Sequence, residues 1–302
     1  MAYLFEGARV VLPDGVEEIS VRVEGAAITG LDVPADGARR IDARGLVLAP
    51  AMVDIHGDAF ERQVMPRPKV FFPMEAAVLE TDRHLAANGI ATAYHALTLS
   101  WEPGLRSVER GESFIDMLEA LRPRLTVENR VQLRWETFAF EAAPLIDRAL
   151  GGALLPSIAF NDHTSMVMRG LDVPIQDRAF EHSPEFITAD PADPRMAARL
   201  DGRIKRSGLS DGEFRDLLAE IWQRRPEVPT AIASVAEAGR ARGVPMLSHD
   251  DTRRETRDYF RGLGARIAEF PMQVAVARAA REAGDMIVFG APNVMRGGSH
   301  IG

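Results

Sequence analysis

The chain has 302 residues, of which 46% are hydrophobic and 26% charged, and its formal net charge is −8. This length accommodates one large α/β barrel or two ordinary domains, and this composition is typical of a globular protein and not of a disordered one. The negative charge argues against nucleic-acid binding, which needs a surplus of Lys and Arg. Because Cys is absent, any metal must be bound by imidazole and carboxylate groups.

The N-terminal sequence shows no targeting segment. No basic region followed by an apolar stretch is found there, and no apolar run is long enough to span a bilayer. We therefore expect a cytoplasmic protein without a membrane partner.

Residues 1–47 predict a small β module. Short β patterns are separated by turn signals such as Pro13-Asp14-Gly15 and Asp36-Gly37. The expected strands cover residues 3–12, 19–23, 27–31 and 46–48.

Residues 48–302 form the main domain, in which strand, loop and helix patterns alternate. This alternation predicts an α/β fold with a parallel sheet or barrel and crossover helices. The expected strands are 47–55, 91–99, 130–138, 154–160, 245–248, 266–270 and 286–289. Helices are expected at 74–88, 107–121 and 271–283, the first ending at Gly89 and the second before Pro123. The polar, proline-containing stretch at about 169–225 is interpreted as an excursion from the barrel, of the size usual for a functional loop or lid.

Candidate metal ligands follow the ends of four expected strands. His56 and Asp58 come at the end of an apolar run, and their i, i+2 spacing sends both side chains to one face. Glu136, His163 and His249 each end a further apolar run. Taken singly, such a residue is as well explained by hydrogen bonds to a loop, but the repetition at one rim of a barrel indicates a shared metal.

An imidazole and carboxylate site suits Zn²⁺ first, with Mn²⁺ and Fe²⁺ as alternatives. This number of ligands exceeds what one tetrahedral ion needs. Two ions about 3.5 to 4 Å apart, bridged by Glu136 and a hydroxide, would use the whole set, and hydrolysis is the reaction that such a pair catalyses best.

Several longer strings resemble the amidohydrolase superfamily, and within it the triphosphate diphosphatases of phosphonate catabolism. The resemblance runs from the first barrel strand to the last residue. The His-x-Asp pair is weakly specific, whereas the later strings are much more specific. The strings are Val53-Asp54-Ile55-His56-Gly57-Asp58, Glu61-Arg62, Met65-Pro66-Arg67-Pro68, Asn161-Asp162-His163-Thr164, Ser248-His249-Asp250-Asp251, Arg266-Ile267-Ala268-Glu269-Phe270-Pro271, Gly290-Ala291-Pro292-Asn293-Val294 and Arg296-Gly297-Gly298-Ser299-His300.

The resemblance implies a (β/α)8 TIM barrel, with residues 1–47 as an incomplete composite β domain. It implies that His56 and Asp58 bind one metal, Glu136 bridges, and His163 and His249 bind the second. The implied substrate is a ribose 5-triphosphate that carries a phosphonate at C1. Attack of a metal-bound hydroxide would release pyrophosphate. The predicted catalytic residues are Glu136 and His249, together with Asp250, which is chosen because it follows His249 in the sequence.

A triphosphate substrate needs fixed cations, and guanidinium groups bind phosphate oxygens in pairs. The candidates for phosphate binding are Arg62, Arg67, Lys69, Arg169, Arg296 and His300. Each of them is equally well explained as a solvated surface charge.

The chain departs from the family pattern at its end. The pattern places a metal-binding, proton-accepting Asp after an eighth barrel strand, but the sequence stops at Gly302, after seven expected strands. We expect truncation, because an open barrel would expose two unpaired edges. The alternative places proton transfer on Asp250 or Asp251. Of the other histidines, His84 and His182 are expected to be structural, and His95 to lie beside the metal ligands.

Two other functions stay open. One is another amidohydrolase reaction, such as deamination or cyclic-amide hydrolysis, which predicts fewer cations at the rim. The other is a non-catalytic relative that binds metal and phosphate. In each case the partner is a small molecule and not a nucleic acid, and a homo-oligomer is possible from the sequence.

Overall fold

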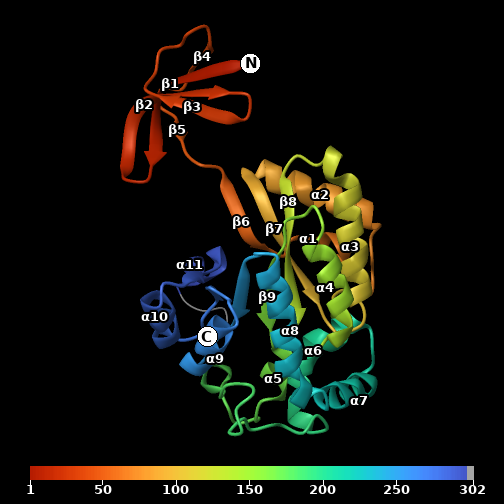
Figure 1. Cartoon of the computed structure of the whole chain (residues 1–302). Helices are drawn as coiled ribbons and strands as arrows, with labels where there is room; N and C mark the ends of the chain where they lie inside the picture. Colours follow the sequence, from red (N-terminus) through yellow and green to blue (C-terminus); the bar gives the residue numbers. More distant parts are fainter. Residues whose placement is uncertain (298–302) are drawn as a thin grey trace. The chain divides into compact units, whose positions relative to one another are not determined.

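A computed structural model describes residues 1–297, which divide into two compact units, Met1–Met52 and the chain from Val53 onward (Figure 1). His300 lies outside the described residues. Within the described residues, no helix is both long and apolar enough to cross a membrane.

The first unit contains a five-stranded sheet, with one strand more, β4, than the four expected. Its strand order is β3-β2-β1-β4, with β5 also paired to β1. Strands β1 and β2 are antiparallel, whereas β4 and β5 run parallel to β1. Ala8, Val10, Val21 and Ala43 form its small core. The strands are β1 Ala2–Leu12, β2 Gly15–Glu24, β3 Ala27–Leu31, β4 Arg39–Asp42 and β5 Val47–Leu48.

The expected single strand over residues 47–55 is wrong. The structure has two strands there, β5 in the small sheet and β6, Met52–Gly57, in the large one. Pro50 lies between them, and a proline cannot donate a ladder hydrogen bond inside a sheet. The boundary between the units accordingly falls after Met52, five residues beyond the expected position.

The second unit contains a seven-stranded sheet of order β12-β11-β10-β9-β8-β7-β6. The neighbouring pairs from β7 to β12 are parallel, which confirms the expected α/β arrangement and fits a TIM-barrel-like fold. An eighth strand stays a prediction. The remaining strands are β7 Ile90–Leu99, β8 Glu128–Glu136, β9 Ser157–Asn161, β10 Met246–His249, β11 Ile267–Glu269 and β12 Met286–Val288.

Helices cover the outer face of this sheet. Helices α2 and α3 pack on β7, α9 on β10, and α10 on β12 (Figure 1). Ser107 caps α3 by accepting a hydrogen bond from the Arg110 amide, 3.2 Å away. The helices are α1 Phe60–Val64, α2 Met74–Ala87, α3 Val108–Leu121, α4 Ala143–Leu150, α5 His163–Met168, α6 Ala197–Ser207, α7 Asp211–Trp222, α8 Val228–Ala241, α9 Arg254–Gly262, α10 Val274–Glu282 and α11 Ala291–Arg296.

Side chains alternate along β8, and this alternation fixes what the inner face carries. Leu133 and Trp135 belong to the core that the sheet shares with the helices. Gln132, Arg134 and Glu136 are therefore on the opposite, inner face. All three are buried.

The expected excursion is present between α5 and α8 and contains α6 and α7. Its segments are held by arginines that donate to backbone carbonyls. Arg199 donates to the carbonyl oxygens of Val167 and Arg169, and Arg178 donates to that of Asp250 at 2.6 Å. The excursion is thus bound to the loop that follows β10.

A buried carboxylate also joins α2 to β8. Asp82 accepts hydrogen bonds from the amides of Thr126 and Val127 and from the side chain of Asn129, at 2.8, 2.9 and 3.0 Å. Hydrogen bonds to a charged group stabilise a fold more than neutral ones.

We therefore expect Asp82→Ala to lower the free energy of unfolding by about 2 to 4 kcal/mol, because three donors, two of them buried, lose their acceptor. Urea denaturation followed by circular dichroism measures this change. The control is Asp116→Ala, which removes an exposed carboxylate paired with Arg148 and should cost less than about 1 kcal/mol. Equal losses in the two variants would contradict the expectation.

Candidate metal centre

The inner-face residues at the ends of the strands form a single polar cluster. The register pairs Glu136 of β8 with Asn161 of β9, and His249 of β10 with Glu269 of β11. Because parallel strands end at the same edge of a sheet, these four side chains meet at one level. All four are buried.

One group that could hold a metal consists of His56, His249 and Glu269. A ligand atom from each lies within 4.8 Å of the other two. His56 Nδ1 is 2.9 Å from Glu269 Oε1, which also accepts a hydrogen bond from Gln132 Nε2 at 3.0 Å. The residues come from β6, β10 and β11, so the group joins an edge strand of the sheet to two strands far along its order.

A second group consists of His163, His249 and Asp250, and it shares His249 with the first. His249 Nδ1 and His163 Nε2 lie 2.9 and 3.7 Å from Asp250 Oδ2. Asp250 has a φ of 58°. A left-handed backbone is uncommon for a residue other than glycine, although Asp tolerates it better than most.

Glu136 contacts the second group through His163. Its Oε1 pairs with His163 Nδ1, and its Oε2 accepts a hydrogen bond from the His163 amide at 3.2 Å. Burial alone would raise the pKa of Glu136, but the His163 imidazole, with Arg203 and Arg134, outweighs burial and lowers that pKa to about 2. The carboxylate is therefore ionised.

The buried polar atoms of these groups test whether a cation fits. No hydrogen-bond partner within residues 1–297 is found for His249 Nε2, Asp250 Oδ1 or Glu269 Oε2. Buried polar atoms are normally satisfied, and several unsatisfied ones at one place need an explanation such as a bound ion. Imidazole and carboxylate donors suit Zn²⁺, Mn²⁺ or Fe²⁺. The site therefore fits a divalent metal.

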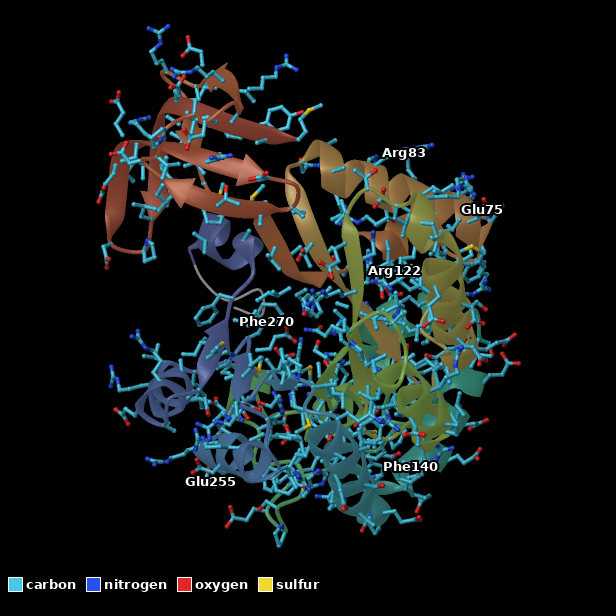
Figure 2. The ribbon with its side chains drawn as sticks, turned by 45° about the horizontal axis from the view of Figure 1, so that its top comes forward. Glu75, Arg83, Arg122, Phe140, Glu255 and Phe270 are labelled. Atoms are coloured by element: carbon cyan, nitrogen blue, oxygen red, sulfur yellow. The ribbon has the colours of Figure 1, made fainter. Side chains whose placement is uncertain are left out.

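An aromatic ring closes one side of the first group. Phe270, labelled in Figure 2, follows Glu269 and has a φ of 53°. Its ring centroid lies 5.0 Å from that of His56 and 5.3 Å from that of His249, both edge to face. Its apolar ring lowers the local dielectric constant, which strengthens electrostatic interactions in the cluster.

The structure thus brings together most of the predicted site residues. Each contacts at least one other residue of the cluster, and they are the predicted ligands His56, Glu136, His163 and His249 and the predicted catalytic residue Asp250. Asp58 is exposed and belongs to neither group within the described residues. Its role as a ligand stays a prediction. His95 faces the helices, where its Nε2 lies 2.6 Å from Asn129 Oδ1 and its ring packs on Phe114, so the structure does not support the expected place beside the metal ligands.

Glu269 is the residue that sequence reasoning missed. It lies in the string 266–271, which resembles the family, but no role was predicted for it. It obeys the same rule as the predicted ligands, since it ends an apolar strand. Applying that rule to β11 would have found it.

The predicted phosphate-binding residues lie in different surroundings. Arg62, Arg67 and Lys69 are exposed on α1 and the loop after it. Arg169 donates to the carbonyl oxygens of Met166 and Val173, at 2.5 and 2.9 Å, and thereby fixes the start of the excursion. Arg296 is within α11, and the placement of its side chain is outside the described features, as is all of His300. Phosphate binding by each of these residues stays a prediction.

Other arginines surround the cluster instead. Glu102, buried after β7, pairs with Arg203 and Arg206 of α6, and Arg203 also donates to the His163 carbonyl oxygen at 3.0 Å. Arg106 forms a two-point pair with Glu61, at 2.8 and 2.9 Å. Three guanidinium groups thus share two carboxylates beside the candidate ligands.

The fold is similar to that of a hydantoinase. The structure aligns with that of the L-hydantoinase (dihydropyrimidinase) of Arthrobacter aurescens, with a TM-score of 0.51 and 13% identity, over 94% of this chain and 57% of the hydantoinase. It also aligns with an uncharacterized protein, with a TM-score of 0.51 and 15% identity, over 95% of this chain and 65% of that one. The chain therefore spans less than two thirds of the length of these two solved structures.

In sequence, the chain is similar to the alpha-D-ribose 1-methylphosphonate 5-triphosphate diphosphatase of Escherichia coli K12. The two are 26% identical over 315 aligned positions, which cover 99% of this chain and 74% of the diphosphatase. No family model matches the chain. The resemblance stated from the sequence strings is confirmed by these two comparisons.

We expect Glu269→Ala to weaken metal binding by at least about 10-fold, because it removes both a candidate ligand and the acceptor for His56. Metal titration with a fluorescent competitor, together with elemental analysis of the purified protein, measures the loss. Glu282→Ala, on the exposed side of α10, is the matched control and should leave binding unchanged. Full metal content and affinity in the Glu269 variant would contradict its place in the site.

Proposed function

We propose that the protein is a metal-dependent hydrolase that releases pyrophosphate from a ribose 5-triphosphate bearing a C1 phosphonate. The observation that carries this proposal is the buried cluster of imidazoles and carboxylates with unsatisfied atoms at the ends of parallel strands. The similarity to the diphosphatase over 99% of the chain supports the choice of substrate.

His56, His249 and Glu269 would hold one divalent ion, and His163 and Asp250 would contribute to a second, with zinc as the first candidate. When bound, such ions acidify water and stabilise negative charge that develops on a phosphoryl group. Glu136 would orient His163 through its two contacts with that residue. Asp58 would serve as a further metal ligand once the substrate is bound.

In the proposed reaction, water attacks the phosphorus atom attached to the ribose 5-oxygen. The bond from this phosphorus to the bridging oxygen breaks, and pyrophosphate leaves with the electron pair. Asp250 is the proposed acceptor of the proton from the attacking water. Its Oδ1 makes no hydrogen bond within residues 1–297, and although burial would raise its pKa, His249 and His163 lower that pKa well below the usual range.

The arginines around the cluster favour an anionic substrate over a cyclic amide. Arg106 and Arg203 are near Glu102 and Glu136, and Arg206 is near Glu102. A phosphorylated substrate can use such guanidinium groups, whereas a neutral ring has no charge for them to bind. The partner that we propose is therefore a small phosphorylated sugar.

We expect the metal-loaded protein to release pyrophosphate from the ribose 5-triphosphate that carries a methylphosphonate at C1, as measured by a coupled pyrophosphate assay. His249→Ala should lower kcat by about 1,000-fold or more, because it removes the residue common to both groups. His84→Ala is the matched control, since His84 lies on the exposed face of α2.

Three outcomes separate the candidate functions. Release that only the His249 variant loses would establish the diphosphatase reaction. Hydrolysis of dihydropyrimidines with no pyrophosphate release would point to a cyclic amidase. Binding of metal and pyrophosphate without turnover of either substrate would identify a non-catalytic relative.

Metal removal gives a separate prediction. Dialysis against a chelator should abolish the activity, and Zn²⁺, Mn²⁺ or Fe²⁺ should restore it to different extents, because the bound ion supplies the nucleophile. Elemental analysis before and after dialysis gives the metal content that belongs to each rate. Activity that survives complete metal removal would contradict the proposed chemistry.

A further inference from the structure

Arg134 is a buried cation on the inner face of β8, and it is poorly paired. Its relative exposure is 6%, yet its one hydrogen bond within residues 1–297 goes from Nη1 to Thr98 Oγ1, at 3.5 Å, and its buried Nε has no partner there. A guanidinium has five N–H donors, and leaving them unpaired in a protein interior costs free energy.

The other two buried arginines among residues 1–297 have carboxylates in direct contact. Arg178 lies 2.8 Å from Glu181, and Arg257 lies 3.5 and 3.4 Å from Asp251 and Asp285. Arg134 has no such ion pair within the described residues and acts on Glu136 and Glu269 only at longer range. Its N–H donors therefore have no carboxylate in direct contact.

The position of Arg134 places any further partner of these donors at the metal cluster. Gln132, two residues earlier on the same face, contacts Glu269 of the first group, and Glu136, two residues later, contacts His163 of the second. Side chains two apart on a strand are neighbours on one face. Arg134 thus lies between the contacts that β8 makes with the two groups.

The strands on either side of Arg134 carry small residues at its level. Its register partners on β7 and β9 are Thr98 and Ala159.

We propose that Arg134 binds a phosphoryl oxygen of the substrate beside the metal cluster. A planar guanidinium suits a phosphoryl group because two parallel N–H groups can meet two oxygens. The inference rests on the proposed function for the choice of phosphate as the anion. It assigns a substrate-binding role to a residue that the sequence pattern placed inside an apolar strand.

The test is the binding of inorganic phosphate and pyrophosphate to the metal-loaded full chain by isothermal titration calorimetry. Arg134→Gln should weaken pyrophosphate binding by about 10- to 100-fold, because a charge-assisted contact is lost. Its metal content, from elemental analysis, should match that of the wild type. Arg130→Gln is the matched control, since Arg130 is on the same strand but pairs with Glu128 and should leave binding unchanged.

Arg134→Lys keeps the charge and loses the paired geometry, so it should bind pyrophosphate about 10-fold more weakly than the wild type even if the Gln variant does not fold. Unchanged anion affinity in a folded variant with full metal content overturns the inference, as does a wild-type protein that binds neither anion. The inference is also overturned if Arg134→Gln binds less metal but its metal-loaded fraction binds pyrophosphate as tightly as the wild type. Arg134 would then only neutralise the charge of the carboxylates.

These measurements separate this inference from the proposed function. Anion binding that depends on Arg134 in a protein that releases no pyrophosphate would support the inference and contradict the diphosphatase reaction. Pyrophosphate release with the same KM in Arg134→Gln as in the wild type would support the diphosphatase reaction and contradict substrate binding by Arg134.

Discussion

Several ionised groups on the inner face of the large sheet are buried away from water, and this desolvation determines how the site is arranged. An isolated buried carboxylate is costly, so each must have a partner or a cation. Glu136 has His163, and Glu269 has His56 and Gln132. The contacts of Glu269 join different strands, and that of Glu136 joins β8 to the start of α5, so the charges are balanced only when these elements are in their native positions. The register and the electrostatics of the cluster therefore support each other.

The same constraint connects the excursion to the site. Glu102 is buried behind the cluster, and two of its partners, Arg203 and Arg206, come from α6 of the excursion. Arg203 also donates to the carbonyl oxygen of His163. A shift of α6 would leave a buried carboxylate without its cations and would release the residue after β9 from its backbone contact. The excursion is thus part of the support of a candidate metal ligand.

The sequence predicted the alternating elements well because helix ends and apolar runs are local signals. The bounds of α2 and α3 differ from the expected ones by one residue at most. The strand ends also led to Glu136, His163 and His249, which lie in one polar cluster and whose role as ligands stays a prediction. Local patterns do not say which sheet a strand joins, which is why β5 and β6 were interpreted as one strand.

Two other features depend on tertiary contacts, so the sequence alone could not give them. Glu269 ends a strand of only three residues, and its importance comes from His56, which is 213 positions away in the chain. Arg134 lies in a strand whose polar side chains point into the barrel, an arrangement that apolar periodicity does not reveal.

The sharing of His249 limits how the two groups can bind metal at the same time. A neutral imidazole has one lone pair for a metal, and its other ring nitrogen carries a proton. If His249 binds an ion with Glu269 and His56, its remaining N–H can donate only to a carboxylate such as Asp250, whose Oδ2 lies 2.9 Å from Nδ1. The second ion would then need ligands besides His163 and Asp250. Glu136 contacts His163 through Nδ1 and the backbone amide, which leaves His163 Nε2 for an ion. A two-metal state would therefore draw on a further ligand, for which Asp58 is proposed, while Glu136 keeps His163 in its orientation.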